Sequence, residues 1–138
     1  LLLTALMRKW MFIFGLILLS GVSFGQKSES EIIVNALKNG DVKAMAVYFP
    51  SNLDMTVLET EDFFSKAQAT QVLSQFFNKN KAVGFVSRHQ GTSQNNDFYQ
   101  VGTLKTNSGD FRVTFFIRKE NGEIYLKRLR IELSETDF

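Results

Sequence analysis

The chain has 138 residues, with 16 basic and 14 acidic side chains, one histidine and no cysteine. Both excess positive charges, Arg8 and Lys9, lie near the N-terminus, so residues 26–138 are close to neutral and give no sign of nucleic-acid binding. Because no disulfide can form, stability must come from the core, and residues 26–138 hold eleven of the 14 phenylalanines of the chain, which makes a large apolar core plausible.

The first 25 residues have the pattern of a cleavable secretory signal peptide. We expect a start at Met7, followed by two basic residues and the uncharged run WMFIFGLILL. The small residues Ser23 and Gly25 suit a cut directly after Gly25. The alternative is a membrane anchor, but a spanning helix needs about 20 apolar residues and this run has about half of that. The pattern predicts export, to the periplasm or the extracellular space, with no membrane span after cleavage.

Residues 26–138 are expected to form one domain whose first half contains three helices. A capping box at Ser28–Glu31 opens the first helix, and Asn39-Gly40 ends it. Asp41 is placed to cap a second, short helix. A second capping box, from Ser65 to Gln68, opens the third helix. The apolar stripe of this third helix consists of Ala69, Val72, Leu73, Phe76 and Phe77.

Period-two alternation predicts five strands. The first runs from Leu53 to Leu58, and an acidic connection from Glu59 to Asp62 follows it. The other strands are predicted at residues 82–90, 98–106, 111–119 and 124–133. Asn121-Gly122 favours a tight hairpin and residues 107–110 a looser one, whereas the polar residues 91–97 are predicted to be a mobile loop. This order favours an α+β fold in which helices pack on a curved antiparallel sheet.

Several short motifs are similar to those of a known family. They are Gly40-Asp41 before a helix ending in Tyr48-Phe49, Ser65-Lys66-Ala67-Gln68-Ala69 leading to Phe76-Phe77, Gly102-Thr103-Leu104, and Phe111-Arg112-Val113-Thr114. Together they resemble domain of unknown function 4783, an uncharacterised family of small exported bacterial proteins. The resemblance implies the cone-shaped nuclear transport factor 2-like (cystatin-like) fold. Members of that fold include isomerases, dehydratases, cyclases and binding or dimerising domains, so the fold implies no single activity.

Alternation also predicts a sheet face that carries arginines. If the apolar positions from Phe111 to Ile117 face the helices, the opposite, outer face carries Arg112, Phe116, Arg118, Leu126, Arg128 and Arg130. Such a face suits a homodimer interface, or a small or anionic ligand bound by Arg112, Arg128 and Arg130. The alternative is a solvated face on which Glu120, Glu123 or Glu132 pairs with the arginines.

His89 is the only histidine and a candidate ligand-binding residue, together with Tyr99. It could act as a general base with Tyr99 or Asp54 as a partner, but catalysis also needs an oxyanion donor within reach. The alternative is a partly exposed histidine in a strand. One histidine without cysteine cannot form the usual zinc site, and no phosphate-binding or nucleophile motif is present. The sequence therefore predicts no catalytic set, no metal and no cofactor.

The leading hypothesis is an exported, non-catalytic module that binds a partner or dimerises. The alternative is a small-molecule enzyme or carrier, of the isomerase or dehydratase type, that uses the cavity of the cone. A position of His89, Tyr99 or Asp54 inside that cavity would favour the alternative.

Overall fold

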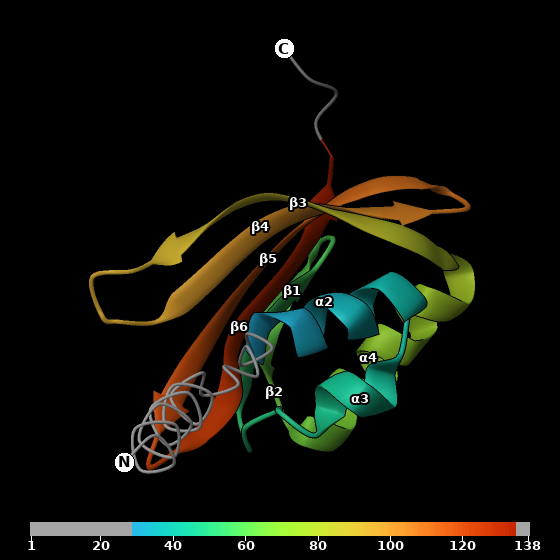
Figure 1. Cartoon of the computed structure of the whole chain (residues 1–138). Coiled ribbons are helices and arrows are strands. Elements are labelled where there is room, and N and C mark those ends of the chain that lie inside the picture. The colour runs from blue at the N-terminus through green and yellow to red at the C-terminus, as the bar shows by residue number, and fades with distance from the viewer. Residues whose placement is uncertain (1–28, 135–138) are drawn as a thin grey trace, which may run out of the picture.

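The computed structural model describes residues 29–134, which form three helices and six strands (Figure 1). The predicted signal peptide, with its start at Met7, lies outside the described residues, as does the predicted capping residue Ser28. Helix α2 covers Glu29–Asn39, α3 covers Val42–Ala46 and α4 covers Lys66–Lys79. The three predicted helices are present, and they lie together on one side of the sheet.

The starts of α3 and α4 have the predicted caps. Asp41 Oδ1 accepts a hydrogen bond of 3.2 Å from the Ala44 N–H at the start of α3. At the start of α4, Ser65 Oγ accepts from the Gln68 N–H at 3.2 Å, and Gln68 Oε1 accepts from the Ser65 N–H at 3.1 Å. These bonds satisfy amides that have no partner within the helix, so the local sequence fixes where each helix begins.

The strands form one sheet in the order β2-β1-β6-β5-β4-β3. Their bounds are β1 Leu53–Val57, β2 Thr60–Phe64, β3 Ala82–Thr92, β4 Phe98–Thr106, β5 Gly109–Glu120 and β6 Glu123–Leu133. Neighbouring strands are antiparallel except β1 and β6, which run parallel. The sheet is therefore mixed rather than purely antiparallel, and Figure 1 shows it curving over the helices.

Strand β2 is an element that the sequence pattern does not predict. The expected acidic connection is instead part of a hairpin, in which Thr60–Phe64 pairs with β1. The strand lies at the edge of the sheet, and its side chains are exposed or half-buried. Its sequence, TEDFF, consequently lacks the alternation that marks a strand with one buried face.

The β5–β6 hairpin is as predicted, with Asn121 at φ 52° and Gly122 at φ 78°. Positive φ at both central residues gives the turn a twist that matches its two strands. Strand β4 also has the predicted bounds, whereas β3 continues two residues beyond the predicted end, to Thr92.

A β-bulge in β6 changes which side chains face the helices. Phe116 is opposite Arg128, but the next residue, Ile117, is opposite Leu126, so Lys127 is the extra residue. Leu126 is therefore fully buried, although strict alternation predicts it on the outer face beside the arginines. That prediction is wrong because alternation does not continue unchanged through a bulge.

The inner face of the sheet and the three helices enclose the core. The predicted apolar face of β5 is confirmed, and its members are buried: Phe111, Val113, Phe115 and Ile117. The helices contribute Ile33, Leu37, Met45, Leu73, Phe76 and Phe77. Phe76 packs edge-on against both Phe77 and Phe111, with ring centroids 5.2 and 5.0 Å apart. The core leaves the outer face of the sheet uncovered by any helix of the described chain.

Candidate functional site

A row of large side chains crosses the outer face of the sheet. Tyr99, Phe116, Arg128, Asp54 and Phe63 are directly opposite one another in β4, β5, β6, β1 and β2. Side chains opposite each other on one face lie about 5 Å apart, so the register brings these five together. We call them the outer row. Its members come from distant parts of the sequence, and only the strand pairing aligns them.

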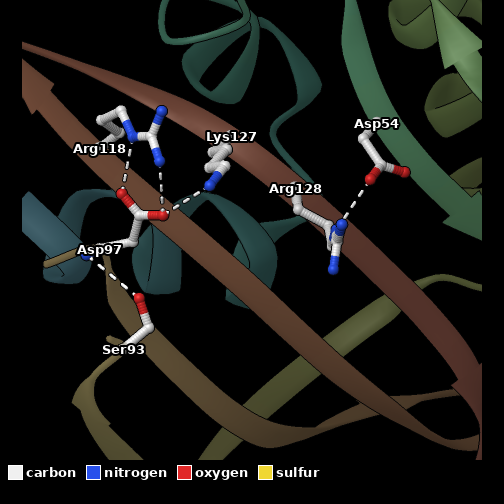
Figure 2. Close-up of polar contacts among 6 residues, drawn as sticks. All are labelled: Asp54, Ser93, Asp97, Arg118, Lys127 and Arg128. Carbon is white, nitrogen blue, oxygen red and sulfur yellow. Dashed lines mark hydrogen bonds and ion pairs between the residues drawn. The ribbon is translucent and has the colours of Figure 1, made fainter. Parts of the chain in front are cut away.

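The outer row is joined by contacts as well as by register. The Tyr99 and Phe116 rings have centroids 5.8 Å apart, and the Arg128 guanidinium lies 5.8 Å from the Phe116 centroid, within range of a cation–π interaction. Arg128 Nε donates a 2.8 Å hydrogen bond to Asp54 Oδ2 (Figure 2). The row therefore has aromatic and charged parts in direct contact.

His89 lies next to one end of this row. Its Nε2 shares a 3.0 Å hydrogen bond with Tyr99 Oη, and the two ring centroids are 5.6 Å apart. Gly91, opposite Tyr99 on β3, makes this possible, because a Cβ there would lie 2.9 Å from Tyr99 Oη. The structure thus brings together the predicted pair His89 and Tyr99. It keeps Asp54 apart, since Phe116 and Arg128 lie between Asp54 and Tyr99.

The arginines of the outer face are mostly paired with carboxylates. Arg128 binds Asp54, and Arg130 Nη2 lies 3.6 Å from Glu61 Oε1. Within residues 29–134, Arg112 is exposed and makes no ion pair. The carboxylates come from β1 and β2 rather than from Glu120, Glu123 or Glu132, which the sequence suggests as partners. The pairing reduces the positive charge that an anionic ligand would meet.

Arg118 belongs to a separate cluster around Asp97. Its Nε and Nη2 donate to the two carboxylate oxygens of Asp97 at 2.8 and 3.0 Å, and Lys127 Nζ donates to Oδ2 at 2.7 Å (Figure 2). The Asp97 side chain is only 2% exposed. We call this group the Asp97 clamp. It fastens the start of β4 to the end of β5 and to the bulge of β6.

The charges of the clamp stabilise one another. The hydrogen bond from Arg118, with further help from Lys127, holds the pKa of the Asp97 carboxyl below its usual range. Asp97 in turn raises the pKa of the Arg118 guanidinium. Ser93 Oγ also accepts a 3.3 Å hydrogen bond from the Asp97 N–H. The polar loop predicted to be mobile therefore ends in a buried, bound carboxylate, which no pattern in the sequence indicates.

A groove lies away from the outer face, between the end of α4, the β1–β2 turn and the end of β6. Its volume is about 800 Å³. None of His89, Tyr99 and Asp54 lines this groove, whose apolar lining is Val57, Leu58, Val72, Phe76 and Leu133. Among the described residues there is no cluster of potential metal ligands. No helix of residues 29–134 is long and apolar enough to cross a membrane.

The geometry can be compared with known proteins. The family model described as "Domain of unknown function (DUF4783)" matches residues 30–132. This chain belongs to the DUF4783 family. A comparison with curated proteins finds no match. The resemblance noted in the sequence is thereby confirmed.

Solved structures of other DUF4783 proteins have the same fold. A family member from Bacteroides uniformis is 25% identical, with a TM-score of 0.72 over 79% of this chain and 100% of its own. One from Bacteroides ovatus is 28% identical, with a TM-score of 0.69 over 76% of this chain and 94% of its own. The Bacteroides uniformis chain is thus matched over its whole length.

The fold extends beyond the family. A protein of unknown function with a cystatin-like fold, from Nostoc punctiforme, is 18% identical, with a TM-score of 0.56 over 76% of this chain and 85% of its own. The predicted fold class, a cone-shaped α+β domain with helices on a curved sheet, is confirmed. This likeness concerns the fold alone.

Proposed function

We propose that this DUF4783 domain is an exported, non-catalytic binding module that self-associates through the outer face of its sheet. The outer row carries the proposal, because it places two half-buried aromatic rings, an arginine and an exposed phenylalanine on one uncovered surface. Export is supported by the signal-peptide pattern of the first 25 residues.

The composition of the outer row is typical of protein interfaces. Tyrosine, phenylalanine and arginine are enriched where proteins meet, and aromatic side chains often supply most of the binding energy. Phe63 is 62% exposed at the end of the row, which is unusual for so large an apolar side chain. Val86 adds a further exposed apolar side chain on β3. Contact with a protein partner would remove these apolar side chains from water and so stabilise the surface.

The charges on this face favour a second copy as the partner. Asp54 and Glu61 lie on the β1–β2 side, whereas Arg88 and Arg112 lie on the β3–β5 side. A two-fold axis that runs parallel to the strands near the middle of the sheet turns the acidic side of one copy over the basic side of the other. The same rotation brings Phe63 over the His89 and Tyr99 region of its partner. Apolar surfaces are then matched on both halves of the interface, and Asp54 and Glu61, which also pair with Arg128 and Arg130 of their own copy, lie opposite further arginines.

A small-molecule enzyme or carrier is the second candidate. Support for catalysis is weak, because His89 and Tyr99 are on the outer face and Asp54 is bound to Arg128. The groove beside α4 supports a carrier role instead, since it is concave, largely apolar and of the size that small ligands occupy.

Self-association makes a testable prediction for Phe63. In the protein comprising residues 26–138, Phe63→Ser is expected to raise the dimer dissociation constant about tenfold, since an interface aromatic contributes about 1.4 kcal/mol or more. Phe63 is already exposed, so the substitution should leave the fold intact. Sedimentation velocity over a wide concentration range measures the change.

Val47→Ser is the matched control for this experiment. Val47 is 70% exposed and directly follows α3, on the helical side of the domain. Its replacement should leave the dimer unchanged. If the two variants weaken the dimer equally, self-association does not use the outer face.

A further inference from the structure

The groove beside α4 has two apolar lips that are exposed to solvent. Leu133, at the end of β6, is 71% exposed, and Leu58, in the β1–β2 turn, is 40% exposed. Between them the groove is lined by Val72 and Phe76 of α4 and by Val57 of β1. The α4 residues that line it run from Val72 to Lys79, about 10 Å along the helix axis at 1.5 Å per residue. The groove is therefore long enough for an extended apolar chain.

The backbone at Leu58 gives an independent reason to expect a ligand. Leu58 has φ 57°, in the left-handed region that suits glycine or asparagine and disfavours leucine. It occupies the first position of a two-residue hairpin turn, with its N–H donating to Ile131 O at 2.8 Å. An exposed leucine is an unfavourable choice here for folding. Sequences break such local rules mainly at functional sites.

The polar part of the groove indicates the charge of the ligand. Lys79, near the end of α4, lines the groove and makes no ion pair within residues 29–134. Gln75 and Asn78, also on α4, add amide groups that can donate hydrogen bonds. Glu59 is the one acidic residue of the lining, and it lies beside Leu58 in the turn. Hydrogen-bond donors and the cation are thus concentrated on the helix side.

From these observations we propose that the groove binds a single-chain apolar molecule with an anionic head group, a carboxylate of the fatty-acid type. The apolar chain lies between Leu58 and Leu133, over Val72 and Phe76. The head group is bound by Lys79 and by the side-chain amides of Gln75 and Asn78. The site is separate from the outer face and does not depend on self-association.

Decanoate, decan-1-ol and decyltrimethylammonium are suitable probes, because they share one chain length and differ in the charge of the head group. Calorimetric titration of the protein comprising residues 26–138 is expected to show the order of affinity decanoate, then the alcohol, then the cation. Lys79→Gln should weaken decanoate binding by about two- to fivefold and leave the alcohol unaffected, since exposed charge pairs contribute modestly. Glu59→Gln should leave decanoate binding equal or stronger.

Leu58→Asn separates binding from folding. Asparagine tolerates positive φ, so the variant should melt at the same temperature or higher. Loss of the apolar lip should weaken decanoate binding about tenfold. Val83→Asn is the matched control, since Val83 is an exposed valine that does not line the groove. The affinity of this variant for decanoate should not change.

Four results would overturn the proposal. The first is no binding of any probe, and the second is tighter binding of decyltrimethylammonium than of decanoate. The third is binding of decanoate only after removal of residues 135–138, which would make the chain's own end the occupant of the groove. Unchanged affinity in Leu58→Asn would likewise place the probe elsewhere.

Discussion

Replacing Gly102 with alanine is expected to destabilise the domain by about 3 kcal/mol, a large cost for one added methyl group. Gly102 lies on the inner face of β4, where the ring of Phe85 covers it. An added Cβ would lie 2.2 Å from Phe85 Cζ and 2.8 Å from the carbonyl oxygen of Val86. The half-buried Phe85 ring would have to give up its place against the core, and the backbone oxygen cannot move without shifting β3. Chemical denaturation monitored by circular dichroism measures the loss.

Gly84→Ala is the control for this prediction, because Gly84 is also a strand glycine. A Cβ there would have only Lys105 Cβ within 4.0 Å, and its φ is not in the left-handed region. The free energy of unfolding should change by no more than about 0.5 kcal/mol. Phe85→Ala added to Gly102→Ala should cost less than the sum of the two single changes, because it removes the clash. Equal effects of Gly102→Ala and Gly84→Ala would show that close packing at Gly102 does not limit stability.

Asp97→Asn is expected to cost about 2 kcal/mol by breaking the Asp97 clamp. Removing one partner of a buried ion pair typically costs about 3–5 kcal/mol. Arg118 and Lys127 are partly exposed and regain some hydration, so we expect the smaller value. Asp110→Asn is the matched control, since it removes the exposed pair with Lys105 and should cost less than about 1 kcal/mol. A loss at Asp97 no larger than at Asp110 would contradict a stabilising role for the clamp.

The clamp also predicts how stability depends on pH. The pKa of Asp97 is lower in the folded protein than in the unfolded chain, where it is about 3.9. The unfolded chain therefore takes up the proton first as the pH falls, which favours unfolding. The advantage of the native protein over Asp97→Asn should be full above about pH 4 and should shrink as the pH falls through the folded pKa. Denaturation of both proteins across this range tests the prediction, and a constant difference would contradict it.

Local chemistry explains why much of the fold follows from the sequence. The caps at Asp41 and Ser65 and the Asn121-Gly122 turn depend on a few adjacent residues, so their positions can be predicted from the sequence alone. The apolar face of β5 can be predicted equally well, because the strand has one buried side and no bulge of its own. In each case the determining interactions are close in sequence.

The features that sequence analysis misses depend on contacts between distant residues. Strand β2 is an exposed edge strand with no buried face to give a pattern. The bulge at Lys127 is visible only in the pairing of β5 with β6, and it moves Leu126 from the predicted outer face into the core. Asp97 looks like an ordinary loop residue until Arg118 and Lys127 are brought to it by the sheet.

The candidate site shows the same limit. The sequence predicts Arg112, Arg128 and Arg130 on one face, and the strand pairing bears out that placement. It does not predict that Asp54 and Glu61 pair with two of them, since β1 and β2 are far from β6 in the chain. The outer row as a whole is a product of the register of five strands, and neither alternation nor spacing reveals it.

The most direct test of the account is the mass in solution of the protein comprising residues 26–138. Light scattering at increasing protein concentration should show a rise from the monomer toward the dimer mass, because the outer row is proposed to bind a second copy. A monomer mass at every concentration would contradict self-association through this face.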